Sequence, residues 1–147
     1  MFNALFSRLK AHPKDKPLPA LDLRRAVAAL MVRLAKSDAH YAFEEIAEID
    51  AILARMHGLN PVEAAQLRAE AERIDAAAPD TEVFIAEVQA HIPYADRVSL
   101  YDALWDVGLA DHALRPQEEA FLAEMARALG IEEGDVTDVA KRHGGGT

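Results

Sequence analysis

Cysteine is absent from this sequence, which excludes disulfide bonds, thiolate metal ligands and a cysteine nucleophile. A structural zinc site would have to use histidine and carboxylate ligands alone, which is uncommon. Aromatic residues make up only 6% of the chain, although 51% of it is hydrophobic. Alanine and leucine supply most of this bulk, which is typical of closely packed helices.

The chain also lacks long apolar runs, and none approaches the roughly 18–20 residues that a membrane span needs. Residues 1–10 are amphipathic and have neither the continuous apolar core nor the cleavage site of a signal peptide. We therefore expect a cytoplasmic location. The 16 basic residues are outnumbered by 25 acidic ones, giving a net charge of −9. Such a surface repels phosphate backbones, so we expect no nucleic-acid partner and favour cations or a protein partner, unidentified from the sequence.

At 147 residues the chain fits one domain. Residues 1–20 form a short amphipathic segment with a Pro- and Lys-rich connector, residues 21–143 a helical domain, and residues 144–147 a glycine-rich flexible tail. Residues 1–10 are expected to pack on the domain, and peripheral contact with a membrane surface is the alternative. No segment shows strand alternation, so the fold class is all-α, a compact bundle of about seven to eight helices.

Hydrophobic periodicity and capping residues place the helices. The pattern predicts helices over residues 22–37, 41–57, 61–76, 80–91, 94–110, 116–129 and 133–142. The sequence Asn60–Pro61–Val62–Glu63 is a strong helix start, with a capping residue, a proline in the first turn and a glutamate at the third position. Asp22 is the expected cap of the first of these helices, and Gly58 closes the second.

Two stretches of the chain resemble each other. Asp38 and Glu45 lie seven residues apart, and Asp111 and Glu118 repeat this pair at an offset of 73 residues. Apolar helices flank both pairs, and both units end in a glycine–aliphatic turn. Such a pattern predicts two pseudo-repeated helix–turn–helix units that pack together.

The two aspartates continue the apolar stripes of their helices, so both are expected to point inward at a helix C-terminus. A negative charge there opposes the helix dipole by roughly 0.3–1 kcal/mol, and burial adds a desolvation cost. Two kinds of partner would compensate. The simpler is capping of the free N–H groups that open the next helix. The other is a hard divalent cation, whose candidate ligands are Asp38, Glu45, Asp111 and Glu118, with His40 and His112 as additional ones.

The spacing excludes several other functions. Neither loop has the oxygen ligands and the turn glycine of an EF-hand. The glycine patterns of nucleotide-binding loops and the His-Glu-x-x-His zinc motif are missing as well. No nucleophile–base pair is visible, so we expect no enzyme.

The sequence LADHALRPQEEAFLAEMARALGI resembles the A-D-G-x-[LV]-x-x-x-E…L…LG signature of tellurite-resistance TerB-like domains, and LAKSDAHYAFEEIAEIDAIL resembles a degenerate first copy. The resemblance covers about residues 21–140. It implies about seven helices with clustered acidic residues, linked to divalent metals and stress responses. The family's glycine after each aspartate is here Ala39 and His112, and its usual Ser–Pro helix start is here Ala42–Phe43 and Arg115–Pro116.

These observations lead to one functional hypothesis and one alternative. The chain is expected to be a TerB-like non-enzymatic module that binds a divalent cation as its cofactor and takes part in a tellurite or general stress response. The alternative is an acidic helical protein-interaction scaffold in which the paired carboxylates are only helix caps.

Overall fold

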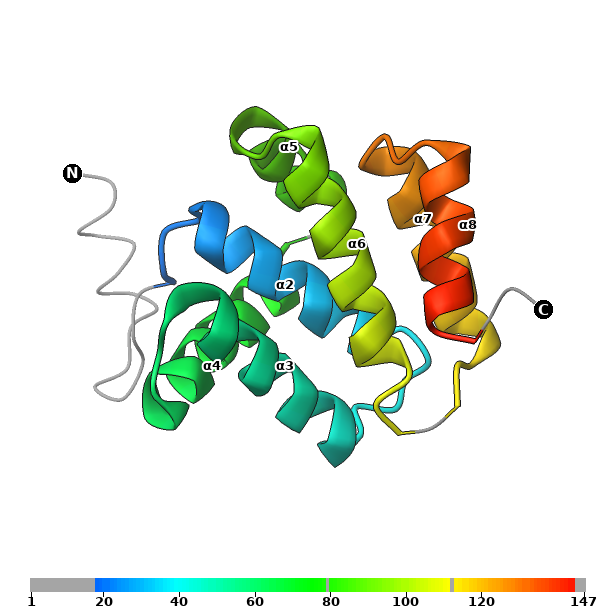
Figure 1. The fold of residues 1–147 in the computed structure, drawn as a ribbon. Helices are drawn as coiled ribbons and strands as arrows, with labels where there is room; N and C mark the ends of the chain where they lie inside the picture. Colours follow the sequence, from blue (N-terminus) through cyan, green and yellow to red (C-terminus); the bar gives the residue numbers. More distant parts are fainter. Residues whose placement is uncertain (1–17, 79, 112, 145–147) are drawn as a thin grey trace, which may run out of the picture.

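Helices account for all the regular secondary structure in the part of the chain that the computed structural model describes, residues 18–78, 80–111 and 113–144. They are α2 (Leu23–Ala35), α3 (Phe43–His57), α4 (Pro61–Ala77), α5 (Glu82–His91), α6 (Tyr94–Gly108), α7 (Pro116–Ala128) and α8 (Glu133–Arg142). Figure 1 shows their order along the chain. The all-α prediction is confirmed. The amphipathic segment predicted over residues 1–10 and the end of the glycine tail lie outside the described residues.

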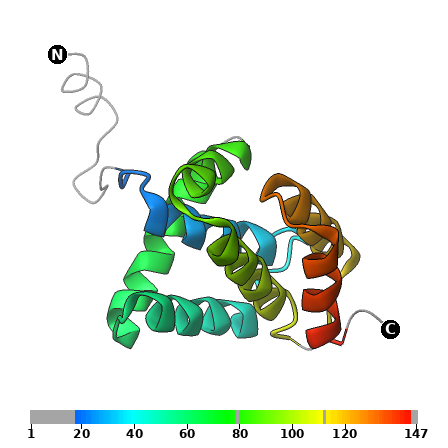
Figure 2. The same ribbon diagram turned by 45° about the horizontal axis from the view of Figure 1, so that its top comes forward.

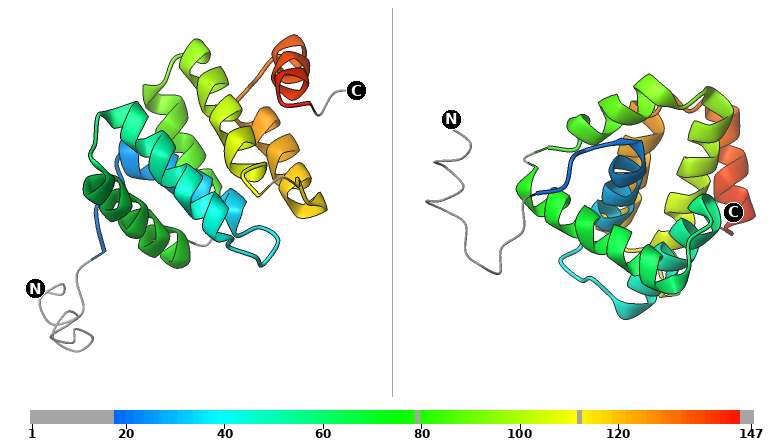
Figure 3. Two further views of the ribbon diagram at one scale, coloured as in Figure 1. Left: turned by 60° about the horizontal axis from the view of Figure 1, so that its bottom comes forward. Right: turned by 90° about the vertical axis from the view of Figure 1, so that its left-hand side faces the viewer.

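The central element is α2, which packs against α3, α4, α5, α6 and α7. Figure 1 and the end-on view of Figure 3 show it running through the middle of the other helices. Nine of its 13 residues are buried, so the helix is covered on nearly all sides rather than along one stripe. Four of the nine are alanines, whose small side chains let the neighbouring helices approach closely.

Helix ends follow the sequence signals closely. Asp22 caps α2 by accepting a hydrogen bond from the Arg25 N–H at 2.9 Å. Asn60 and Glu63 form a full capping box at the start of α4. Gly58 ends α3 with a φ of +65°, a left-handed conformation that is easy only for glycine. These three predictions are confirmed.

Four predicted helices are too long by two residues at one end. Those predicted over residues 41–57 and 80–91 begin at Phe43 and Glu82. The other two end too late, and this difference matters for the site. The helix predicted over residues 22–37 ends at Ala35, and the helix predicted over residues 94–110 ends at Gly108. The next residues form turns stabilised by aspartate side chains, which compete with the backbone for N–H groups. Asp38 and Asp111 therefore lie in the connectors between helices.

The α7–α8 pair packs on α6 on the side away from α4 (Figure 2), and α7 also touches α2. Trp105 of α6 is buried and stacks on the ring of His143, just beyond α8, with 5.6 Å between ring centroids. His143 Nε2 lies 2.8 Å from Asp106 Oδ1. These contacts hold the C-terminal end of α8 against α6. None of the helices in the described residues has the length and apolarity to cross a membrane.

A buried ion pair holds α2 against α4. Arg33 Nε donates to Asp75 Oδ1 at 2.6 Å, and the two side chains are only 18% and 8% exposed. Arg33 also donates to the backbone carbonyls of Asp75 and Ala78, and its guanidinium lies over the ring of Phe84 at 5.0 Å. The full set of donors and acceptors makes this charge tolerable in the interior.

Candidate functional site

Two connectors meet at one end of the bundle. The α2–α3 connector spans residues 36–42 and the α6–α7 connector spans residues 109–115, and they lie close together in Figures 1 and 3. Each carries one repeat aspartate. The Asp38 side chain is 3% exposed and the Asp111 side chain 11%, so both point inward as their place on the apolar stripes predicted.

Each aspartate stabilises its own connector. Asp38 Oδ1 accepts the backbone N–H of His40 at 2.9 Å, and Asp111 Oδ1 accepts that of Ala113 at 3.4 Å. The prediction that the aspartates cap the following helices is therefore wrong, because they close the turns that precede those helices. Between Asp38 and His40, Ala39 has a φ of +64°, a left-handed conformation that is strained for a residue with a Cβ.

The repeat glutamates cap the helices instead. Glu45 Oε1 accepts the Ala42 N–H at 3.1 Å, and Glu118 Oε1 accepts the Arg115 N–H at 3.0 Å. This is one half of a capping box. The other half is missing in both units, because neither Ala42 nor Arg115 has a side-chain acceptor. Both glutamate side chains are fully buried.

The second carboxyl oxygen of each glutamate is left without a donor. Glu45 Oε2 and Glu118 Oε2 are buried atoms with no hydrogen-bond partner, and the two carboxyl groups face each other across the α3–α7 contact. Burial raises the pKa of Glu45 to about 9; contact with Glu118 and the charge of Asp111 add to this rise, while the Ala42 N–H opposes it. Two buried carboxyl groups this close cannot both ionise easily, so the pair holds one proton at neutral pH.

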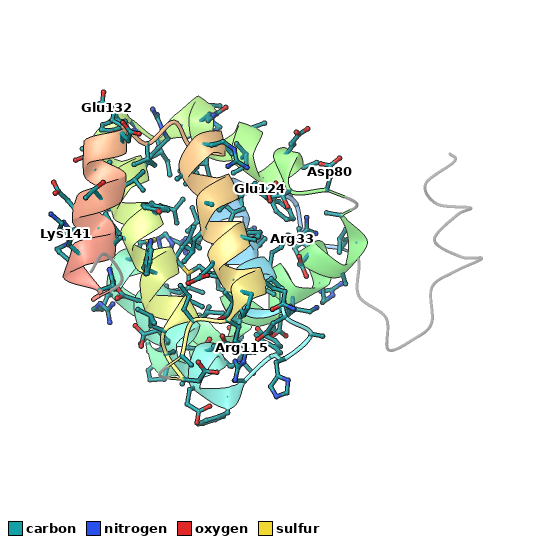
Figure 4. All side chains as sticks on the ribbon, turned by 90° about the vertical axis from the view of Figure 1, so that its right-hand side faces the viewer. Arg33, Asp80, Arg115, Glu124, Glu132 and Lys141 are labelled. Atoms are coloured by element: carbon teal, nitrogen blue, oxygen red, sulfur yellow. The ribbon has the colours of Figure 1, made fainter. Side chains whose placement is uncertain are left out.

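Arg115 bridges the two aspartates. Its Nη1 atom donates to Asp111 Oδ2 at 2.7 Å and lies 3.3 Å from Asp38 Oδ2. Figure 4 shows Arg115 at the N-terminal end of α7, beside the α2–α3 connector. Partial burial favours the neutral form of Asp111 and so raises its pKa. The hydrogen bond from Arg115 and the positive charge of the guanidinium have the larger combined effect, and the pKa of Asp111 is lowered. One guanidinium therefore joins the two units.

The four predicted carboxyl ligands thus form two pairs, Asp38 with Asp111 through Arg115 and Glu45 with Glu118, and the charge of Asp111 acts on Glu45. We call these four residues the carboxyl cluster. The candidate ligand His40 is exposed and contributes only its backbone N–H, and His112 lies outside the described residues. Among the residues that are described, no group of three or more histidine, aspartate or glutamate side chains is arranged to hold a metal ion as it stands. Metal binding stays a prediction.

Sequence reasoning missed two parts of this site. The contact between Glu45 and Glu118 joins residues 73 positions apart, and nothing in the local pattern gives that pairing. Arg115 gave a clearer signal, because it lies four residues after Asp111, a spacing at which opposite charges often meet. Its reach to Asp38 depends on how the connectors approach each other.

The fold and the site define an all-α module in which two connectors bring two aspartates to one arginine, beside a buried pair of glutamates. A comparison with known protein families gives a match to the tellurite resistance protein TerB over residues 24–141, which is most of the chain. The chain belongs to the TerB family. Comparison with curated proteins and with solved structures found no match.

Proposed function

We propose that this chain is a non-enzymatic TerB module whose carboxyl cluster binds a divalent cation as part of a response to tellurite or another stress. One observation carries the proposal. Glu45 Oε2 and Glu118 Oε2 are fully buried, come from two different helices, and have no hydrogen-bond donor other than the one proton that the two carboxyl groups share. Buried oxygens without donors are rare in folded proteins and call for an explanation, and a cation would satisfy both.

The donor chemistry fits a hard cation. Magnesium, calcium and manganese ions prefer carboxylate oxygen ligands, and the cluster offers these from Asp38, Glu45, Asp111 and Glu118. A bound ion would supply positive charge to a place where two aspartates share a single guanidinium and two glutamates are buried. Such an ion would link α2, α3, α6 and α7 through their connectors and first turns.

The two serine hydroxyl groups in the described residues make structural contacts. The hydroxyl groups of Ser37 and Ser99 donate to backbone carbonyls three and four residues earlier in the chain, which is an ordinary structural use of serine. Neither hydroxyl has an imidazole or carboxylate base as its hydrogen-bond acceptor in these contacts.

The interaction scaffold remains the second candidate, and one observation favours it. A shallow groove of about 290 Å³ lies between α3 and α6. Its walls combine apolar Ile52 and Met56 with acidic Asp102 and Asp106, and Met56 is 44% exposed. A basic, partly apolar protein segment would complement this surface. On this alternative the carboxyl cluster serves only to hold the connectors together.

Metal titration separates the two candidates. The full chain is freed of metal with a chelator and then titrated with MnCl₂, MgCl₂ or CaCl₂, and binding is followed by calorimetry and thermal melting. A cation that binds only the folded state at 100 times its Kd adds about 2.7 kcal/mol to the free energy of unfolding. The rise in melting temperature should disappear in the double variant Asp38→Asn/Asp111→Asn and persist in Asp138→Asn, which removes an exposed carboxylate.

The absence of a rise with all three ions, or an equal rise in the double variant, would overturn the metal proposal. The stress assignment is tested separately. A strain that lacks this protein should grow poorly on tellurite, and the wild-type chain should restore growth. If the double variant restores growth as well as the wild type does, the stress response does not depend on the carboxyl cluster.

A further inference from the structure

We infer that the basic N-terminal segment of this chain, residues 1–17, docks in the groove between α3 and α6 of the same molecule. These residues lie outside the described part of the chain, whereas the groove is described. The groove shares no residue with the carboxyl cluster, so this docking is a property beyond the proposed function and does not depend on metal binding.

The α6 wall of the groove offers carboxylate oxygens to a basic ligand. Asp106 Oδ1 lies 2.8 Å from His143 Nε2, and Asp102 Oδ1 lies 3.3 Å from Arg142 Nη2. Within the described residues no contact uses the Oδ2 atom of either aspartate, and the two side chains are 35% and 40% exposed. Positive charge is therefore accommodated at this wall.

The α3 wall of the groove has a different character. Ile52 and Met56 make it partly apolar, and Arg55 adds one basic side chain. Met56 is 44% exposed. A ligand that fits both walls places apolar side chains against Met56 and brings its positive charge to the aspartates of α6.

The N-terminal segment has this combination of side chains. Residues 1–17 contain four basic residues and one acidic residue, whereas the other 130 residues contain 12 basic and 24 acidic ones. A segment of net charge +3 is thus joined to a domain of net charge −12, and the two attract each other. The first ten residues also supply apolar side chains, which are Phe2, Leu5, Phe6 and Leu9.

The segment joins the domain beside the groove. Burial lowers the pKa of His57, the last residue of α3, and the charges of Arg24 and Asp22 also act on this pKa. The beginning of α2 therefore lies next to the end of α3 (Figure 1), and Met56 precedes His57 directly.

The distance to be covered is short. An extended stretch of eight residues, such as residues 10–17, spans up to about 26 Å. The α6 wall from Ser99 to Asp106 is about 10 Å long at the rise of an α-helix. Residues 1–10 can therefore reach the whole groove from the point where the described chain begins.

The covalent connection favours this segment over a separate protein. A short tether holds its free end at an effective concentration in the millimolar range. A shallow groove of about 290 Å³ gives only weak binding, which suffices for a tethered segment but not for a dilute partner. A separate basic protein has to displace the segment before it can use this groove.

The test uses the absence of cysteine from the chain. In the full chain, Asn3→Cys carries a single nitroxide label, and broadening of the backbone amide signals reports which residues lie near it. Docking predicts strong broadening at residues 99–106 of α6 and weaker broadening at residues 61–68 of α4, which follow the end of α3 directly. Equal broadening of α6 and α4 is expected of a tethered segment that does not dock, and it would overturn the inference, as would no broadening of α6.

Two substitutions with matched controls test the chemistry of the contact. Arg8→Glu reverses a charge in the segment, and Met56→Lys makes the α3 wall basic. Each should reduce the broadening of α6 at least about two-fold, because the attraction is electrostatic and acts at short range. Arg127→Glu and Val62→Lys make the same changes at exposed positions outside the groove and should leave the broadening unchanged. Equal losses in variants and controls would contradict the assigned contact.

A mixing experiment identifies the molecule that supplies the segment. Nitroxide-labelled chain without ¹⁵N is mixed with ¹⁵N-labelled chain that carries no nitroxide. Unbroadened α6 signals in this mixture support docking within one molecule, whereas broadened signals assign the groove to the segment of a second copy and refute the inference. The result of the metal titration has no bearing on these outcomes, so the two proposals stand or fall separately.

Discussion

The protonated pair formed by Glu45 and Glu118 makes stability depend on pH in a direction opposite to that of an ordinary surface carboxylate. Burial and contact with Glu118 raise the pKa of Glu45 to about 9 in the folded state, from an ordinary value of 4.5. Between these values the folded chain binds a proton that the unfolded chain has released. Stability is therefore highest at low pH in this window and falls as the pH rises.

The variant Glu45→Gln removes this dependence. A glutamine amide keeps an oxygen for the Ala42 N–H and gives Glu118 a permanent N–H donor, so the geometry is kept and the proton is not needed. One proton bound in the folded state corresponds to about 1.4 kcal/mol per pH unit. Between pH 6 and 8 the wild type should therefore lose up to about 2.7 kcal/mol relative to Glu45→Gln.

Urea unfolding at pH 6, 7 and 8 measures this difference, with circular dichroism and the fluorescence of the single tryptophan, Trp105, as probes. The matched control is Glu44→Gln, which neutralises the exposed neighbour of Glu45 on the same first turn. Burial lowers the pKa of His57 below its ordinary value. Its contribution is present in all three proteins and cancels in the differences.

The reasoning is refuted if the stability difference between Glu45→Gln and wild type stays constant within about 0.5 kcal/mol from pH 6 to 8, the size of an ordinary surface effect. The same holds if the control changes as steeply as Glu45→Gln. Proton uptake on folding, measured by calorimetry in buffers of different ionisation enthalpy, provides an independent check, and Glu45→Gln should take up close to one proton fewer than wild type.

Two further predictions concern stability alone. Ala39→Gly should raise the free energy of unfolding by about 1 kcal/mol, because glycine adopts the left-handed conformation of this residue without strain. The control Ala47→Gly, at an exposed position within α3, should lower the free energy of unfolding by a similar amount. Thermal melting of both variants checks the sign of each change. Asp75→Ala should cost about 2–4 kcal/mol in urea unfolding, because it leaves the buried Arg33 guanidinium without its carboxylate, whereas exposed Asp138→Ala should change stability by less than about 0.5 kcal/mol. An Asp75→Ala protein as stable as wild type would show that this ion pair contributes little.

Much of the fold could be predicted from the sequence because its signals are local. Helix periodicity, the Asn60 cap and the Gly58 terminus each act within a few residues, and the structure confirms them. The errors fall at helix ends, where Asp38 and Asp111 compete with the helix for backbone N–H groups. Such competition shortens each helix by two residues without disturbing its apolar pattern.

The site was predictable as a set of residues but not as an arrangement. The repeat pattern identifies the four carboxyl groups, yet their contacts cross between units. Glu45 meets Glu118, and Arg115 reaches Asp38, 77 positions away. Each of these contacts depends on the relative placement of α3 and α7, which the local sequence does not encode. The burial of the glutamates was also missed, since a first-turn glutamate is normally exposed and favourable to the helix dipole.

The burial of α2 on nearly all sides has a consequence for how the chain is made. This helix leaves the ribosome before every helix that covers it, and α6 is complete only after a further 73 residues, counted from Ala35 to Gly108. At the usual 5–20 residues per second, its apolar surface waits roughly 4–15 seconds for that cover. The nascent chain is therefore expected to engage a ribosome-associated chaperone during this interval, and to be most prone to aggregation when translation pauses between α2 and α6.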